Sequence, residues 1–229
     1  MALFAIGDLH LSLGSDKPMD IFSGWDNYVD RLQENWLKEV GAEDTVVLAG
    51  DSSWGMSLQE SLTDFRFIDK LPGKKIVMKG NHDYWWSTKS KMDGFFEENG
   101  LETIQILHNN SFKVGNAVVC GTRGWLFEAG EPHDQKILNR EAGRLDMSIR
   151  HAMQYGGEII AFLHYPPVYG NQLSAKIVDV LVKHNIQRCY YGHLHGQSCD
   201  YALRGQFAGI QFELISGDFL KFKPLKIQV

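Results

Sequence analysis

The sequence predicts an α/β fold in which helices cover the faces of buried β-sheets, and two observations favour this class. Short apolar runs alternate with longer segments in which apolar residues recur at helical spacing. Strands that are apolar on both faces are typical of sheets buried beneath helices. After Asp200, short β-type runs follow one another with glycine-containing turns between them. This β-rich tail favours a second sheet over one all-parallel sheet.

In the first half of the chain, three apolar strands alternate with helices. We expect strands at Leu3–Gly7, Thr45–Ala49 and Lys75–Met78. A helix is expected between the first two strands, because seven apolar residues lie on one helical face: Trp25, Tyr28, Val29, Leu32, Trp36, Leu37 and Val40. The segment Ser57–Glu60 matches a capping box and predicts the start of a second helix, which Pro72-Gly73 ends. A short helix is expected at Met92–Glu98.

The second half is richer in strands. The expected strands are Thr103–Leu107, Ser111–Val114, Ala117–Cys120, Ile159–Leu163 and Ile186–Tyr191. The expected helices are a long one at Asp134–Gln154, which Gly143 weakens, and a shorter one at Leu173–His184. The chain contains no visible repeat, low-complexity tract or linker, so we expect residues 1–229 to form a single domain.

Composition excludes some classes of function. The chain has 229 residues, 44% of them hydrophobic, and a net charge of -5, which disfavours general binding to nucleic acid. Its three cysteines are odd in number and have no C-x-x-C spacing, so we expect reduced thiols and a cytoplasmic location. No window approaches the ~18 apolar residues of a membrane span, and no basic segment precedes the first strand. We therefore expect neither a membrane helix nor a signal peptide.

Five polar clusters each follow an apolar strand. They are Asp8-Leu9-His10, Gly50-Asp51, Gly80-Asn81-His82-Asp83, His164, and Gly192-His193-Leu194-His195. Taken singly, each is compatible with a turn or a structural histidine. In α/β folds, however, ligands collect at the carboxyl ends of strands, so five clusters at strand ends are expected to lie together.

The residue types in these clusters fit a site for two divalent metal ions. In extended backbone, the D-x-H and H-x-H patterns would turn both side chains to the same side. Asp51 can bridge two cations with its two oxygens, and Asn81 offers a neutral amide oxygen. His82 follows an expected ligand, so it should point elsewhere and be free for acid chemistry. Asp83 can orient a ring by hydrogen bonding.

Together the five clusters resemble the signature of the calcineurin-like metallophosphoesterase superfamily. That signature is Asp-x-His, Gly-Asp, Gly-Asn-His-Asp/Glu, a later His, and Gly-His-x-His. The match runs from Asp8 to His195, which is nearly the whole chain. The resemblance implies a four-layer αββα sandwich, in which two mixed sheets pack face to face with helices outside.

The resemblance also implies the roles of individual residues. One ion would be held by Asp8, His10, Asp51 and His195, and the other by Asp51, Asn81, His164 and His193. His82 would be the catalytic imidazole near the leaving group, and Asp83 would orient it or support the ligand shell. Mixed nitrogen and oxygen ligands favour Mn, Fe, Zn or Ni over Ca. Two divalent ions supply +4 against -2 from Asp8 and Asp51, which leaves +2 to attract a phosphate.

Other features near the clusters are open to two interpretations. Trp54, Trp85, Trp86 and Trp125 either pack in the core or rim, or form a stacking surface for a planar group. Arg123 either donates two hydrogen bonds to a substrate phosphate or forms a surface salt bridge. We also expect the segment from Phe127 to Lys136 to form a loop over the site.

The predicted function is phosphoester hydrolysis, in which a hydroxide bridging two metal ions attacks phosphorus. Ser52-Ser53-Trp54 follows Gly50-Asp51, where phosphoprotein phosphatases have an Asp-Arg pair, so a Ser/Thr protein phosphatase is disfavoured. We expect a small phosphoester substrate, a phosphodiester more than a monoester, with nucleotide-like compounds as one option. The alternatives are a non-catalytic metal-binding scaffold and a nuclease. The sequence predicts no membrane partner and no particular oligomeric state.

Overall fold

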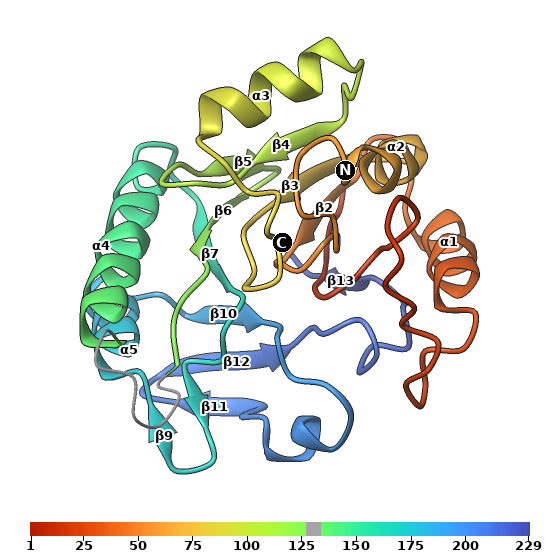
Figure 1. The fold of residues 1–229 in the computed structure, drawn as a ribbon. Helices are drawn as coiled ribbons and strands as arrows, with labels where there is room; N and C mark the ends of the chain where they lie inside the picture. The colour runs from red at the N-terminus through yellow and green to blue at the C-terminus, as the bar shows by residue number, and fades with distance from the viewer. Residues whose placement is uncertain (127–133) are drawn as a thin grey trace.

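The computed structural model describes residues 1–126 and 134–229, and two β-sheets pack face to face with helices on their outer faces (Figure 1). The first sheet has the order β13-β1-β2-β3-β4. Its strands are β1 (Leu3–Ile6), β2 (Thr45–Leu48), β3 (Lys74–Val77), β4 (Ile104–Ile106) and β13 (Leu225–Ile227). Strands β1 to β4 are parallel, and β13 is antiparallel to β1.

The second sheet has the order β11-β12-β10-β7-β6-β5. Its strands are β5 (Phe112–Val114), β6 (Ala117–Thr122), β7 (Glu158–Leu163), β10 (Arg188–Tyr191), β11 (Gly205–Phe207) and β12 (Ile210–Leu214). The four central strands are parallel, and the two edge strands β5 and β11 are antiparallel to their neighbours. Both sheets are therefore mixed, which confirms the predicted fold class.

Three apolar cores hold the four layers together. Helices α1 (Tyr28–Glu39), α2 (Leu62–Lys70) and α3 (Lys89–Glu98) share one core with the first sheet. Helices α4 (Asp134–Ala152) and α5 (Ala175–Lys183) share a second core with the other sheet. The third core lies between the sheets and takes alternate strand residues such as Leu3 and Ala5, while Phe4 and Ile6 face the helices. This double burial explains why β1, and β2 after Thr45, are apolar without interruption.

The two sheets meet at the carboxyl ends of their parallel strands. Gly7, directly after β1, forms a bridge with Ser216 beyond β12, and its amide donates to the carbonyl of Ile215 at 2.7 Å. The amide of Gly192, after β10, donates to the carbonyl of His164, after β7. The loops that carry the five polar clusters are thereby brought to one edge of the molecule.

Several predicted boundaries were wrong. Leu37 is 58% exposed and does not lie on the buried face of α1. Helix α2 begins at Leu62, because Ser57 and Glu60 cap a preceding turn: Ser57 Oγ accepts from the Glu60 amide, and Glu60 Oε2 accepts from the Met56 amide.

Short elements were missed, and one expected loop is partly helical. The sequence did not predict the hairpin of β8 (Val168–Tyr169) and β9 (Gln172–Leu173) or the 3₁₀ turn Gly196–Tyr201. Of the expected loop from Phe127 to Lys136, residues 127–133 lie outside the described residues and the last three begin α4. Among the residues that the structure describes, no helix is long and apolar enough to cross a membrane.

Candidate metal centre

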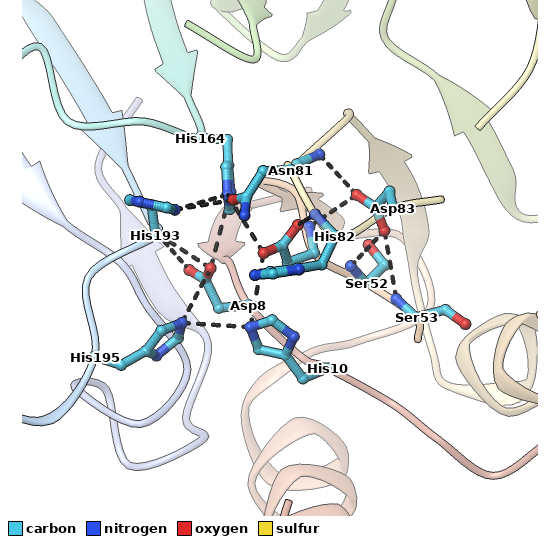
Figure 2. A network of polar contacts seen from close by, with 12 residues as sticks. Asp8, His10, Ser52, Ser53, Asn81, His82, Asp83, His164, His193 and His195 are labelled. Carbon is cyan, nitrogen blue, oxygen red and sulfur yellow. Dashed lines mark hydrogen bonds and ion pairs between the residues drawn. The ribbon is translucent and has the colours of Figure 1, made fainter. Parts of the chain in front are cut away.

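All seven predicted metal ligands converge at the edge where the sheets meet, and Figure 2 labels all of them except Asp51. A first group consists of Asp8 and His10 after β1 and His195 after β10. Nε2 of His195 lies 3.5 Å from Oδ1 of Asp8 and 3.3 Å from Nε2 of His10. Two imidazole nitrogens and a carboxylate oxygen thus face a common point.

A second group lies beside the first. Oδ1 of Asn81 is 2.6 Å from Nε2 of His164 and 2.9 Å from Nδ1 of His193. Oδ2 of Asp51 is 3.4 Å from the same nitrogen of His164. This group contains the neutral amide oxygen, two imidazoles and a carboxylate that the sequence predicted for the other ion.

Asp51 lies between the two groups. Its Oδ2 is 3.7 Å from Nε2 of His10 in the first group and 3.4 Å from Nε2 of His164 in the second. Its Oδ1 accepts a hydrogen bond of 2.8 Å from the backbone amide of His82. A carboxylate in this position can contribute to both ions.

The backbone that presents the ligands is unusual. Asp8, His10, Asp51 and His193 all have positive φ angles, of 58°, 45°, 51° and 74°. A non-glycine residue in this region costs on the order of 1–3 kcal/mol and persists at functional sites where the surrounding structure holds it. The extended backbone assumed for the D-x-H pattern is therefore wrong, although its two side chains do converge.

Glycines make room for the carboxylates. A Cβ atom on Gly80 would clash with Oδ1 and the backbone nitrogen of Asp51, and one on Gly192 would clash with Oδ2 of Asp8. Both glycines belong to the predicted motifs, and the close approach of a ligand carboxylate explains why this residue type stands there.

Burial sets the charge state of the centre. It lowers the pKa of His10 and of His193 to about 3, so both imidazoles are neutral, as metal ligands must be. Burial, followed by the negative charges of Asp83 and Asp8, raises the pKa of Asp51 well above its usual value. Neutral imidazoles around crowded, buried carboxylates favour a divalent cation, so the donor set fits the predicted metals.

His195 has a partner that the sequence did not predict. Its Nδ1 is 2.9 Å from Oδ1 of Asp218, whose Oδ2 accepts from the amide of Gly196. Burial lowers the pKa of His195, but the hydrogen bonds to Asp218 and Asp8 outweigh it and raise the pKa to about 10. The contact with Asp218 leaves Nε2 for the centre. From the sequence, only short β-type runs and glycine-containing turns are expected in this part of the chain, and Asp218 belongs to none of the five clusters.

His82 stands beside the donors and is not buried among them. Its Nδ1 is 3.3 Å from the hydroxyl of Tyr84, and its ring centroid lies 4.6 Å from Trp54 and 5.8 Å from His10. Burial lowers its pKa. The contact with Tyr84, which was not predicted, leaves Nε2 available to a substrate.

The Asp83 carboxylate is fully buried and binds backbone. It accepts hydrogen bonds from the amides of Asp51, Ser52 and Gly80 and from the indole of Trp85, at 2.7–2.9 Å. Of the two roles predicted for Asp83, this geometry supports the one in which it holds the ligand loops. Among the described residues, its hydrogen-bond partners do not include the ring of His82.

Arg123 lies against a buried acid. Its guanidinium is 3.8 Å from Oε1 of Glu141, which is fully buried, and 5.0 Å from the centroid of the Trp125 ring. Of the two interpretations, the ion pair is present, although it is largely buried and not on the surface. Contact between Arg123 and a substrate phosphate stays a prediction.

Five of the six tryptophans divide into two sets. Trp54 stacks on His10 with ring centroids 4.9 Å apart, and Trp25, which was expected only as a helix residue, packs 5.6 Å from His195. The other three pack against neighbouring aromatic rings away from these ligands: Trp85, Trp86 and Trp125.

Comparison with known proteins supports the predicted family. A model of the calcineurin-like phosphoesterase family matches residues 1–197. A search of curated proteins finds no match. Among solved structures, a protein of unknown function from Aquifex aeolicus is 18% identical, with a TM-score of 0.51, and the match covers 98% of this chain and 95% of that one.

Two further structures are similar in fold. Phosphopantetheinyl hydrolase from Mycobacterium tuberculosis is 14% identical, with a TM-score of 0.55 and coverage of 99% and 95%. A Thermus thermophilus protein is 12% identical, with a TM-score of 0.55 and coverage of 84% and 81%. At these identities the structures establish the fold alone. The match of the family model over most of the length establishes that the chain belongs to the calcineurin-like phosphoesterase family.

Proposed function

We propose that this metal-dependent hydrolase cleaves small phosphoesters, and phosphodiesters in preference to monoesters, with two divalent transition-metal ions. The observation that carries the proposal is the position of Asp51 between two groups of nitrogen and oxygen donors. When bound, two divalent ions activate water and neutralise charge on phosphoryl oxygens. Mn, Fe, Zn and Ni fit the mixed donors.

The residues around the donors have separate roles in this proposal. His82 donates a proton or hydrogen bond from Nε2 to the leaving oxygen, because its Nδ1 is turned to Tyr84. Asp83 keeps the Asp51 and Asn81 loops at a fixed separation through its backbone hydrogen bonds. Asp218 orients His195. Arg123 is proposed to approach the phosphate from the side of Glu141.

The preference for diesters has two supports. The Asp-Arg pair of phosphoprotein phosphatases is absent after Gly50-Asp51, and aromatic rings stand beside His10 and His82 to receive an organic group. We also propose a cytoplasmic location, because all three cysteines are buried free thiols.

Turnover tests the proposal. Purified protein loaded separately with Mn²⁺, Fe²⁺, Zn²⁺ or Ni²⁺ should hydrolyse bis(p-nitrophenyl) phosphate faster than p-nitrophenyl phosphate. A wider set should include cyclic nucleotides and a phosphopantetheinyl ester, which the name of the Mycobacterium tuberculosis enzyme suggests. Asn81→Ala and His82→Ala should each lose most of the turnover while keeping the wild-type circular dichroism spectrum.

Three results would contradict this function. Hydrolysis of no phosphoester with any of the four metals would exclude it. Fewer than one tightly bound transition metal per chain, measured by elemental analysis, would favour the non-catalytic scaffold. Degradation of single-stranded DNA at a rate above that of the small diesters would favour the nuclease.

A further inference from the structure

A cavity of about 410 Å³ opens beside the first group of metal donors. Its lining consists of His10, Met19, Phe22, Ser23, Trp25, Trp54, His82, His195 and Gly196. Its volume falls within the range of sites that bind small organic molecules. Three of the lining side chains are imidazoles of the candidate centre: His10, His82 and His195. The cavity therefore adjoins the place where the centre would hold a phosphate, and it offers room for the group esterified to that phosphate.

The cavity walls come from four separate segments. Met19, Phe22 and Trp25 belong to the loop between β1 and α1, and Trp54 to the loop after β2. His82 follows β3, and His195 follows β10. The indole of Trp54 stacks on His10 with an interplanar angle of 27°, and the indole of Trp25 lies 5.7 Å from the same imidazole at 62°. The two indoles therefore flank one ligand of the centre.

The chemistry of the lining selects against charged groups. Among the described residues that line the cavity, none is Asp, Glu, Lys or Arg. Lys17 has its ammonium 5.1 Å from the centroid of the Trp54 ring, but it does not line the cavity. Apart from the imidazoles and the N–H groups of the two indoles, Ser23 is the one polar side chain in the lining, so a nucleoside would leave most of its hydrogen-bonding groups unpaired there.

Phe22 is unusually exposed for its type. It is 52% exposed at the cavity wall, and its neighbour Ile21, which does not line the cavity, is 73% exposed. An aromatic ring with one face open toward a hydrophobic cavity gains free energy when an apolar ligand covers it.

We propose that this cavity binds the organic group of the substrate, and that this group is uncharged and apolar, a planar ring in preference to a nucleoside. The proposal rests on the proposed phosphoester hydrolysis and narrows its substrate class. Trp25, Trp54 and Phe22 contact the ring, while the phosphate occupies the donors of the centre. The diester preferred by the enzyme then has an aryl or similar hydrophobic substituent.

Binding of phosphonates, which resist hydrolysis, tests the proposal without turnover. Zn²⁺-loaded protein is titrated by calorimetry with phenylphosphonate, methylphosphonate and the methylenephosphonate analogue of adenosine monophosphate, which also resists hydrolysis. Phenylphosphonate should bind about tenfold more tightly than methylphosphonate, because a hydrophobic pocket discriminates at least this strongly for several carbon atoms. The adenosine monophosphate analogue should bind more weakly than phenylphosphonate.

Variants of two adjacent residues locate the effect. Phe22→Ala should reduce the ratio of the affinities for phenylphosphonate and methylphosphonate to about threefold or less, while the affinity for methylphosphonate stays unchanged. Phe22→Leu should restore most of this ratio. Ile21→Ala is the matched control, since Ile21 is adjacent and more exposed, and it should change neither affinity.

Equal affinities for phenylphosphonate and methylphosphonate would overturn the proposal, as would tighter binding of the adenosine monophosphate analogue than of phenylphosphonate. Equal effects of Phe22→Ala and Ile21→Ala would also overturn it. Failure of the proposed hydrolysis is distinguishable, because it would appear as absent turnover of every phosphoester while the binding selectivity is measured independently.

Discussion

At Asp83, a single carboxylate joins the two loops that carry Asp51 and Asn81. Four hydrogen-bond donors lie within 2.9 Å of this carboxylate, and three of them are backbone amides. Asp83 is 1% exposed, so water is not at hand to accept from these donors if the carboxylate is lost. Buried amides without an acceptor each cost about 1–3 kcal/mol. Asp83 therefore contributes to folding and to the site through the same contacts.

Asp83→Asn should lower the free energy of unfolding by about 2–4 kcal/mol, because an amide replaces one acceptor oxygen with a donor that faces other donors. Urea denaturation of the metal-free protein measures this. Asp93→Asn is the control: Asp93 is exposed and pairs with Lys89 one helical turn away, so its loss should cost below about 0.5 kcal/mol. A similar loss in both variants would contradict the role of Asp83.

Asp218→Ala should weaken metal binding about 10- to 100-fold, since groups that orient a ligating imidazole contribute on this scale. Without Asp218, Nδ1 of His195 loses its acceptor, and the ring is no longer held with Nε2 toward Asp8. Competition with a fluorescent chelator gives the affinity. Asp218→Asn keeps an acceptor oxygen and should recover part of the metal affinity. An unchanged metal affinity in Asp218→Ala would show that other contacts orient His195.

At the scale of elements, Gly80 and Gly143 differ in the effect that a substitution by alanine should have. A Cβ atom on Gly80, in the loop after β3, would overlap the Asp51 carboxylate, whereas one on Gly143, in α4, would meet no atom within 4 Å. Gly80→Ala should displace Asp51 and abolish tight metal binding. Gly143→Ala should raise the free energy of unfolding by about 0.5–1 kcal/mol. Elemental analysis and urea denaturation measure the two effects, and normal metal content in Gly80→Ala would contradict the first.

The elements that the sequence predicted well are those whose pattern reflects burial on two sides. Strands β1, β2 and β3 were found because Phe4 and Leu3, for example, enter different cores and both must be apolar. The pair β8 and β9 was missed because two-residue strands have no periodicity to detect. The positions of the five clusters were predicted because each follows such a strand, and the structure brings all seven expected ligands together.

The parts of the site that escaped prediction depend on tertiary structure. The left-handed backbone of Asp8 and His10 is held by hydrogen bonds from their amides to the carbonyls of Gly50 and Asp51, in the loop after β2. Asp218 comes from a segment after β12 and reaches His195 only when the second sheet is complete. Neither contact leaves a local pattern in the sequence.

At the scale of the whole molecule, the centre takes ligands from both sheets. Asp8, His10, Asp51 and Asn81 follow strands of the first sheet, and His164, His193 and His195 follow strands of the second. A metal ion that binds only the folded chain raises its stability by about 2.7 kcal/mol at a free concentration 100 times its dissociation constant. The ions should therefore hold the two sheets together.

Removal of metal with a chelator should lower the melting temperature by several degrees, and addition of Zn²⁺ or Mn²⁺ in excess should restore it. Differential scanning calorimetry measures the shift. The Asn81→Ala variant, which lacks one donor, should show a smaller shift, and Ile21→Ala should show the full one. A melting temperature that does not respond to metal would contradict a centre that spans both sheets.

The pairing of β13 with β1 has a consequence for the kinetics of folding. Leu3 and Ile227 are partners across almost the full length of the chain, so their contact closes a very long loop and is expected to form late. Until it forms, β1 is an edge strand with unpaired backbone groups and apolar side chains on both faces. Such an edge is a template for pairing between molecules. The yield of refolding should therefore fall as the protein concentration rises, because pairing of β1 between molecules competes with its pairing with β13.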